Sequence, residues 1–130
     1  MKPVLLTSIG KTIMTVSVIA TLSACGSMGN TDAIKDASEL AIDCKTDKAL
    51  AALDRAGQGG GLAAHIADLE RVVILRDAGR MSEAAAVMAE RNTRAKADAE
   101  AKAEAEEAVA ESLVELRSER QKRTGSRTCP

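Results

Sequence analysis

The chain contains no phenylalanine, tyrosine or tryptophan, and this absence limits what its 130 residues can fold into. Aromatic side chains bury the largest areas, so a core must be built here from Leu, Ile, Val, Met and Ala, and it will be thin. The many alanines, only two prolines and 28% charged residues favour helix over sheet. We therefore expect one small all-α domain.

The first 25 residues have the pattern of an export signal. Lys2 and Lys11 supply positive charge, and Thr12–Leu22 is an uncharged, mostly apolar run of 11 residues. A membrane-spanning helix needs about 20 residues, so this run suits the apolar region of a cleaved secretory signal instead. The motif Leu22-Ser23-Ala24-Cys25 follows directly, and it resembles the lipobox of bacterial lipoproteins.

This resemblance implies a signal peptide of residues 1–24 that is removed before Cys25. It also implies a diacylglycerol on the sulfur of Cys25 and an acyl chain on its new amino group, which together anchor a protein stably. Gly26, in the position where an Asp favours retention in the inner membrane, points to the outer membrane with the domain facing the periplasm. The alternative is an ordinary secreted protein with a Cys near its cleavage site.

The mature chain is mildly acidic. Removal of Lys2 and Lys11 from the 18 basic residues leaves 16 against 19 acidic ones, a net charge of −3. Nucleic-acid-binding proteins normally carry a basic excess, so we expect no nucleic-acid partner. Residues 25–30 are small and polar after the Cys, and we expect them to form a flexible tether.

Residues 31–92 show helical periodicity interrupted by turns. Apolar residues at spacings of three and four predict a helix that starts at an N-cap on Thr31, and a second helix that ends at Gly57. Two more helices follow the glycine-rich segment 57–61. The second pair superposes on the first at an offset of 35 residues, which places Gly79 on Cys44 and Met88 on Leu53. We expect two helical hairpins.

The segment "DAGRMSEAAAVMAE", residues 77–90, resembles the second half of a tetratricopeptide repeat, with Gly79 in the turn and bulky residues at Met81 and Met88. The resemblance implies that the first helix of each hairpin lines a partner-binding groove. The residues that would face this groove are Ile66, Leu69, Val73 and Arg76. Aromatic residues and a closing Pro are missing, and Arg91 replaces a small residue, so a generic four-helix bundle is the alternative.

Residues 93–123 lack Gly and Pro and are rich in Ala, Glu, Lys and Arg. As one continuous helix they would extend about 46 Å. Val109, Leu113 and Leu116 form a short apolar stripe. Two repeats bury too little to stand alone, so we expect this stripe to cover the groove as a cap. Pairing of this helix with a second copy is the alternative, and residues 124–130 read as a loose tail.

Cys44 and Cys129 remain once Cys25 is assigned to lipid. Two thiols in an oxidising compartment favour one disulfide between them. The alternatives are a buried Cys44 with a free Cys129, or a bridge from Cys129 to another molecule.

Motifs for catalysis, metals and cofactors are absent from the sequence. His65 is the only histidine and has no Cys or His at a metal-ligand spacing. The glycine-rich segment 57–61 is not followed by Lys and Ser or Thr, as phosphate binding would require. We expect no catalytic residues, no metal, no small-molecule substrate and no cofactor other than the lipid on Cys25.

These observations predict a non-enzymatic lipoprotein that acts as an adaptor or scaffold, with an envelope protein as partner. Short tetratricopeptide-like lipoproteins commonly serve secretion, conjugation or pilus systems, so the setting rests on analogy. The alternative is a structural lipoprotein whose alanine-rich residues 93–123 form a coiled coil. The chain ends in Cys129-Pro130 rather than in the Lys that attaches such proteins to the cell wall, which disfavours this alternative.

Overall fold

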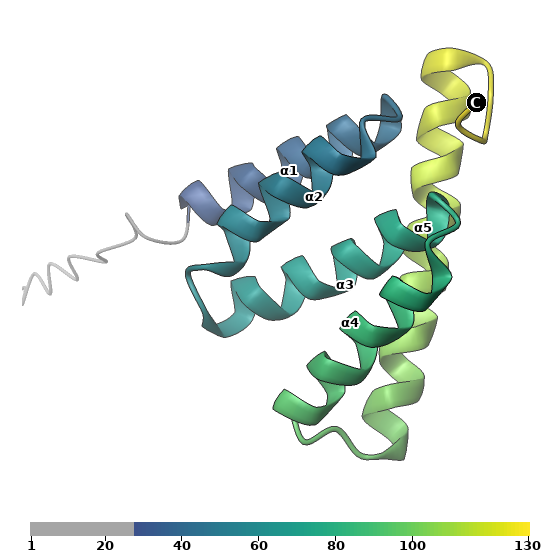
Figure 1. Cartoon of the computed structure of the whole chain (residues 1–130). Coiled ribbons are helices and arrows are strands. Elements are labelled where there is room, and N and C mark those ends of the chain that lie inside the picture. The colour runs from purple at the N-terminus through teal and green to yellow at the C-terminus, as the bar shows by residue number, and fades with distance from the viewer. Residues whose placement is uncertain (1–27) are drawn as a thin grey trace, which may run out of the picture.

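The structure of the protein, a computed structural model, describes residues 28–130 and confirms the all-α prediction (Figure 1). The predicted signal peptide and the predicted lipidation site, Cys25, lie outside the described residues. Within them there are five helices and no strand: α1 (Met28–Ile42), α2 (Thr46–Gly57), α3 (Gly61–Asp77), α4 (Met81–Arg94) and α5 (Ala99–Thr124). No helix in this part of the chain is long and apolar enough to cross a membrane.

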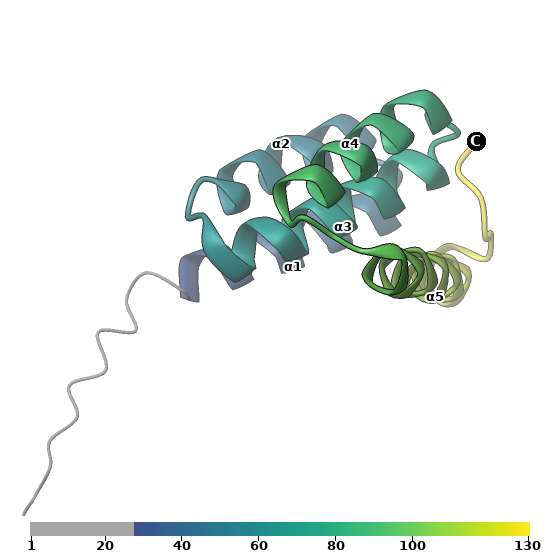
Figure 2. The same cartoon turned by 90° about the horizontal axis from the view of Figure 1, so that it is seen from below.

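The helices form two hairpins and a cover. Helices α1 and α2 form the first hairpin, α3 and α4 the second, and the hairpins stack through contacts between α2 and α3. Figure 2 shows α1 and α3 on one side of this stack, α2 and α4 on the other, and α5 across the α1 and α3 side. Helix α5 packs mainly on α3 and also touches α1.

Small side chains make up much of the core, as the missing aromatic residues predict. Ala37, Ala49, Ala52 and Ala56 are all fully buried, and they let α1, α2 and α3 approach closely. Larger aliphatic residues fill the remaining space, chiefly Leu53, Val72, Val73, Ile74, Leu75, Met88 and Val109. Because each alanine adds little buried area, many contacts of modest size stabilise this fold.

The turns of the two hairpins have the same geometry 35 residues apart. At the end of α1 the N–H of Lys45 donates to the carbonyl of Leu40 at 2.8 Å, and at the end of α3 the N–H of Arg80 donates to the carbonyl of Leu75 at 2.8 Å. The residue before each donor is left-handed, with φ of 60° at Cys44 and 73° at Gly79. Both helices therefore end in a Schellman motif, as the superposed sequences predict.

The prediction of one helix over residues 93–123 is wrong at its start. Helix α4 continues to Arg94, and α5 begins only at Ala99. Lys96 takes a left-handed φ of 50°, which ends α4. The carboxylate of Asp98 then accepts a hydrogen bond from the N–H of Ala101 at 2.9 Å and caps the next helix. This break lets α5 turn back along α3.

Three smaller predictions also need correction. Helix α1 begins at Met28, so Thr31 lies inside it and the tether is shorter than residues 25–30. The side chain of Asn30 lies against Gly59 of the α2–α3 loop, which gives this first turn a packing partner. Met81 and Leu62 belong to the predicted apolar faces, yet they are exposed, because neither α5 nor a neighbouring hairpin reaches them.

Candidate functional site

Helix α5 lies over part of the face of α3 on which the sequence places a partner-binding groove. Val109 and Leu116 of α5 are buried at this contact, and Leu113 packs at its edge. An ion pair of 2.7 Å between Arg76 of α3 and Glu106 of α5 joins the two helices beside the apolar contact. Helix α5 thus occupies the position expected of a cap.

Helix α5 covers or engages some of the four residues predicted to bind a partner and leaves the others accessible. Val73 is only 2% exposed, and the guanidinium of Arg76 is engaged by Glu106. Leu69 is half-buried against the core, whereas Ile66 is 40% exposed. Ile66 is therefore accessible and Leu69 partly accessible, whereas Arg76 is paired with Glu106 inside the molecule.

A groove remains where α1, α3 and α5 meet. Its volume is about 230 Å³, and Val73 forms part of its floor. Helix α1 contributes Ser38 and Ile42, α3 contributes Glu70, Val73 and Ile74, and α5 contributes Ser112, Glu115, Leu116 and Glu119. The first helices of both hairpins and the cap therefore enclose one small site with an apolar floor and acidic walls.

Glu70 has no cation beside it in the described part of the chain. No hydrogen bond or ion pair joins Glu70 to another described residue, and the charge that acts on it is the like charge of Glu115. Glu115 also feels the charge of Lys122. Burial of Glu70, followed by the nearby charge of Glu115, raises the pKa of the Glu70 carboxyl. Glu119 differs, because it pairs with Lys122 at 2.6 Å. The groove therefore suits a group that brings positive charge.

Arg120 holds the cap in place. Its side chain is 1% exposed and forms an ion pair with Asp77, the last residue of α3. The same guanidinium donates to the carbonyls of Ala41 at 2.8 Å and Ile42 at 3.2 Å. It also donates to the carbonyl of Arg127 in the C-terminal tail at 2.9 Å. One side chain thus binds the ends of α1 and α3 and the tail.

Asp77 receives two arginines from α5. Arg117 donates to its carboxylate at 3.0 Å, beside the contact from Arg120. Burial alone would raise the pKa of Asp77, but the hydrogen bonds from Arg120 and Arg117 outweigh burial and hold this pKa below its ordinary range. Asp77 is therefore ionised at neutral pH and orients α5 on α3.

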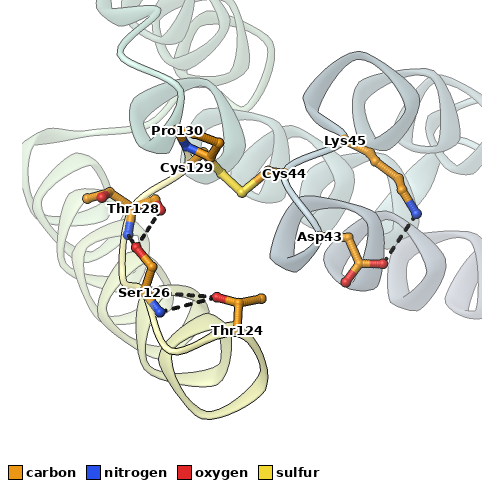
Figure 3. A pocket seen from close by; sticks show the side chains of 8 residues that line it. All are labelled: Asp43, Cys44, Lys45, Thr124, Ser126, Thr128, Cys129 and Pro130. Atoms are coloured by element: carbon orange, nitrogen blue, oxygen red, sulfur yellow. Dashed lines mark hydrogen bonds and ion pairs between the residues drawn. A yellow bond between two sulfur atoms is a disulfide. The ribbon is translucent and has the colours of Figure 1, made fainter.

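A disulfide fastens the C-terminal tail to the turn between α1 and α2. The structure joins Cys44 and Cys129 within the chain, across 85 residues of sequence (Figure 3). Thr124, Ser126 and Thr128 hydrogen-bond one another along the tail. The hollow between tail and turn is lined by Asp43, Cys44, Lys45, Thr124, Ser126, Thr128, Cys129 and Pro130. Apart from Asp43 and Lys45, these are neutral residues that secure the tail.

No group of His, Cys, Asp and Glu residues among the described positions is arranged to hold a metal ion. His65 is half-buried, and its Nδ1 atom meets no hydrogen-bond partner. Gly60 and Gly61 take positive φ angles of 66° and 56°, and they serve the turn into α3. The groove itself presents carboxylates, two hydroxyls and an apolar floor.

Two features of this site were not predicted from the sequence, namely the burial of Arg120 and the position of Glu70 in the groove. Arg120 lies in a run of charged residues, and nothing in that run marks one arginine as buried. Glu70 left a usable signal, because it follows Ile66 by four residues and precedes Val73 by three, which places a carboxylate on the predicted groove face.

Comparison with known proteins adds no relative to this picture. No family model, no curated protein and no solved structure matches the chain.

Proposed function

We propose that this protein is a lipid-anchored adaptor of the bacterial cell envelope, facing the periplasm from the outer membrane, which docks a segment of a partner protein in the groove between α1, α3 and α5. The observation that supports this function best is the pair of carboxylates in that groove. Glu70 and Glu115 stand over an apolar floor, and Glu70 has no cation of the described residues beside it, whereas Glu115 shares the charge of Lys122 with Glu119. A buried carboxylate costs free energy unless it is paired, so a partner's cation would improve the site.

The chemistry of the groove defines the partner segment. A Lys or Arg side chain would reach Glu70 and Glu115, and an aliphatic side chain beside it would rest on Val73 and Leu116. The exposed Ile66 extends the apolar surface along α3 from the groove. A secretion, conjugation or pilus machine is the setting proposed for this partner, by analogy with other small helical lipoproteins.

The packing of α5 favours this function over a structural coiled coil. Val109, Leu116 and Ala105 face the core of the same molecule, so the apolar stripe of α5 is already used. Val114 is the large apolar side chain that α5 leaves exposed, at 63%. A stable coiled coil needs a continuous apolar seam, which this outer face lacks. We therefore propose a monomer rather than a homo-oligomer through α5.

Site-specific photocrosslinking in living cells tests the adaptor function. A photoreactive residue replaces Ser112 in the groove or Ile66 beside it on α3, and Lys48 on the exposed face of α2 serves as the matched control. We expect a defined envelope protein to be trapped from the two groove positions and not from Lys48. The double substitution Glu70→Gln and Glu115→Gln should remove that product, whereas Glu104→Gln, an exposed carboxylate elsewhere on α5, should leave it.

Crosslinks of equal yield from Lys48, or products that contain only this chain or cell-wall material, would argue against the adaptor. The second result would direct attention to the structural alternative.

A further inference from the structure

At one end of the domain, the start of α1 lies beside the loop that connects the two hairpins. Helix α1 starts there, three residues after Cys25, and the α2–α3 loop lies beside it (Figure 1). The contact is close, because a Cβ atom built on Gly59 would fall 2.1 Å from the Nδ2 atom of Asn30. The start of α3 is therefore fixed next to the point where the chain leaves the domain toward Cys25.

The α2–α3 loop and the first turns of α3 carry no charged side chain, although Asp32 and Lys35 are exposed on the first turns of α1. Leu62, in the first turn of α3, is 76% exposed, more than any other large apolar side chain among the described residues. Ile66 lies one helical turn further and is 40% exposed. No Asp, Glu, Lys or Arg occurs from Ala56 to Ala67, although 28% of the chain is charged. This surface is therefore weakly hydrated.

The length of the tether limits how far this end can lie from the lipid. The three chain steps from Cys25 to Met28, through Gly26 and Ser27, span at most about 11 Å when fully extended. Apolar side chains of peripheral proteins enter the boundary between headgroups and acyl chains to a depth of about 5–10 Å. An anchored Cys25 therefore places Leu62 within reach of that boundary.

We infer that Leu62 and the uncharged α2–α3 loop form a second membrane contact, in which Leu62 enters the lipid interface beside the anchor. The inference rests on the proposed anchoring of Cys25. It also sets an orientation, because α3 then runs away from the bilayer. The ends of α3 and α1 that hold Arg120 and the C-terminal tail face the periplasm (Figure 1).

A chain without aromatic residues offers a direct test. A tryptophan introduced by substitution would be the only indole in the protein, so its fluorescence would report on that one position without background. The full-length lipidated protein is prepared as Leu62→Trp, Met81→Trp and Val114→Trp, and each is reconstituted in vesicles of phosphatidylethanolamine and phosphatidylglycerol with brominated acyl chains. Met81 and Val114 are matched controls because they are 58% and 63% exposed and lie away from the tether.

Bromine quenches indole only at short range. We expect quenching of Leu62→Trp to be at least about twofold stronger than quenching of either control, with its emission shifted to shorter wavelength. Equal quenching at all three positions, or none at position 62 while the protein floats with the vesicles, would overturn the membrane contact and leave the anchor intact. Failure of all three proteins to float with the vesicles would overturn the anchor and the contact together.

Discussion

Asp77 and Arg120 form an ion pair that is closed to water, across 43 residues of sequence. Their side chains are 7% and 1% exposed. Asp77 ends α3, and Arg120 lies near the end of α5, so the pair fixes the crossing of the cap over the second hairpin. The carbonyls of Ala41 and Ile42 add the end of α1 to the same guanidinium. The groove depends on this arrangement because the same three helices form its walls.

Replacement of Arg120 by Met should destabilise the protein by about 3–5 kcal/mol. The substitution leaves Asp77 buried with only Arg117 as a partner, and it removes the donor from three carbonyls, those of Ala41, Ile42 and Arg127. Urea unfolding followed by circular dichroism at 222 nm measures the change. Arg117→Met is the control. Its side chain is 38% exposed, so its loss should cost less than about 1 kcal/mol. Equal losses would refute a special role for Arg120.

The lowered pKa of Asp77 predicts instability in acid. Because the folded pKa lies below the unfolded value of about 3.9, the ion pairs contribute their full stability above that pH. This contribution is lost as the pH falls through the folded pKa. Unfolding measured at a series of pH values should therefore show a fall in stability below about pH 4. The same series on Asp77→Asn, which starts less stable, should lack this component. An unchanged pH slope in the variant would contradict the assignment.

The raised pKa of Glu70 predicts the opposite dependence of stability on pH. Its folded pKa lies above the unfolded value of about 4.3, so its favourable contribution is present below that pH and is lost as the pH rises through the folded pKa. Glu70→Gln should therefore be more stable than the natural protein at neutral pH, and the two should converge in acid. The same variant should lose partner crosslinking, so stability and binding change in opposite directions. A less stable variant at neutral pH would show that Glu70 has an internal partner.

Loss of the disulfide should cost up to about 4.5 kcal/mol in the chain-entropy model, because the bond closes a long loop. Unfolding of the natural protein with and without a thiol reductant measures the difference. The double variant Cys44→Ala and Cys129→Ala should match the reduced protein and show no response to the reductant. If reduction left the stability of the natural protein unchanged, the disulfide would contribute nothing to the stability of the fold.

The turn between α3 and α4 depends on the left-handed backbone of Gly79. Gly79→Ala should cost about 1–2 kcal/mol, because a Cβ disfavours positive φ. Gly57→Ala is a matched control. Neither position has an atom within 4 Å of an added Cβ, and Gly57 ends α2 without a positive φ. The control should be neutral or slightly stabilised in thermal unfolding. Similar losses in both variants would mean that side-chain volume, not backbone conformation, decides the result.

The sequence predicted the hairpins well because their signals are local. Apolar spacing, and the equivalence of Cys44 with Gly79, depend on residues within a few turns of each other. The boundary at residues 95–98 was missed because no Gly or Pro marks it, and because Asp98, which caps α5, stands among other charged residues. Propensity alone does not distinguish an alanine-rich helix that continues from one that restarts.

The burial of Arg120 could not be predicted for a different reason. Its partners are Asp77 and the carbonyls of Ala41 and Ile42, some 43 to 79 residues away, and only the crossing of α5 brings them together. The groove depends on the same crossing, so its acidic walls came from the structure rather than from the sequence. Ile66 was expected beneath the cap yet is 40% exposed, and Arg76 was assigned to a partner yet binds Glu106.

The bond between Cys44 and Cys129 also divides the molecule mechanically. It closes residues 44 to 129 into a covalent ring, and α1 lies outside that ring. A pulling force applied between the N-terminal side of α1 and Pro130 would pass along α1 and cross directly through the two sulfur atoms. Under such a load only α1 would bear tension, and α2 to α5 would bear none. Such a load would leave the groove residues of α3 and α5 inside the closed ring.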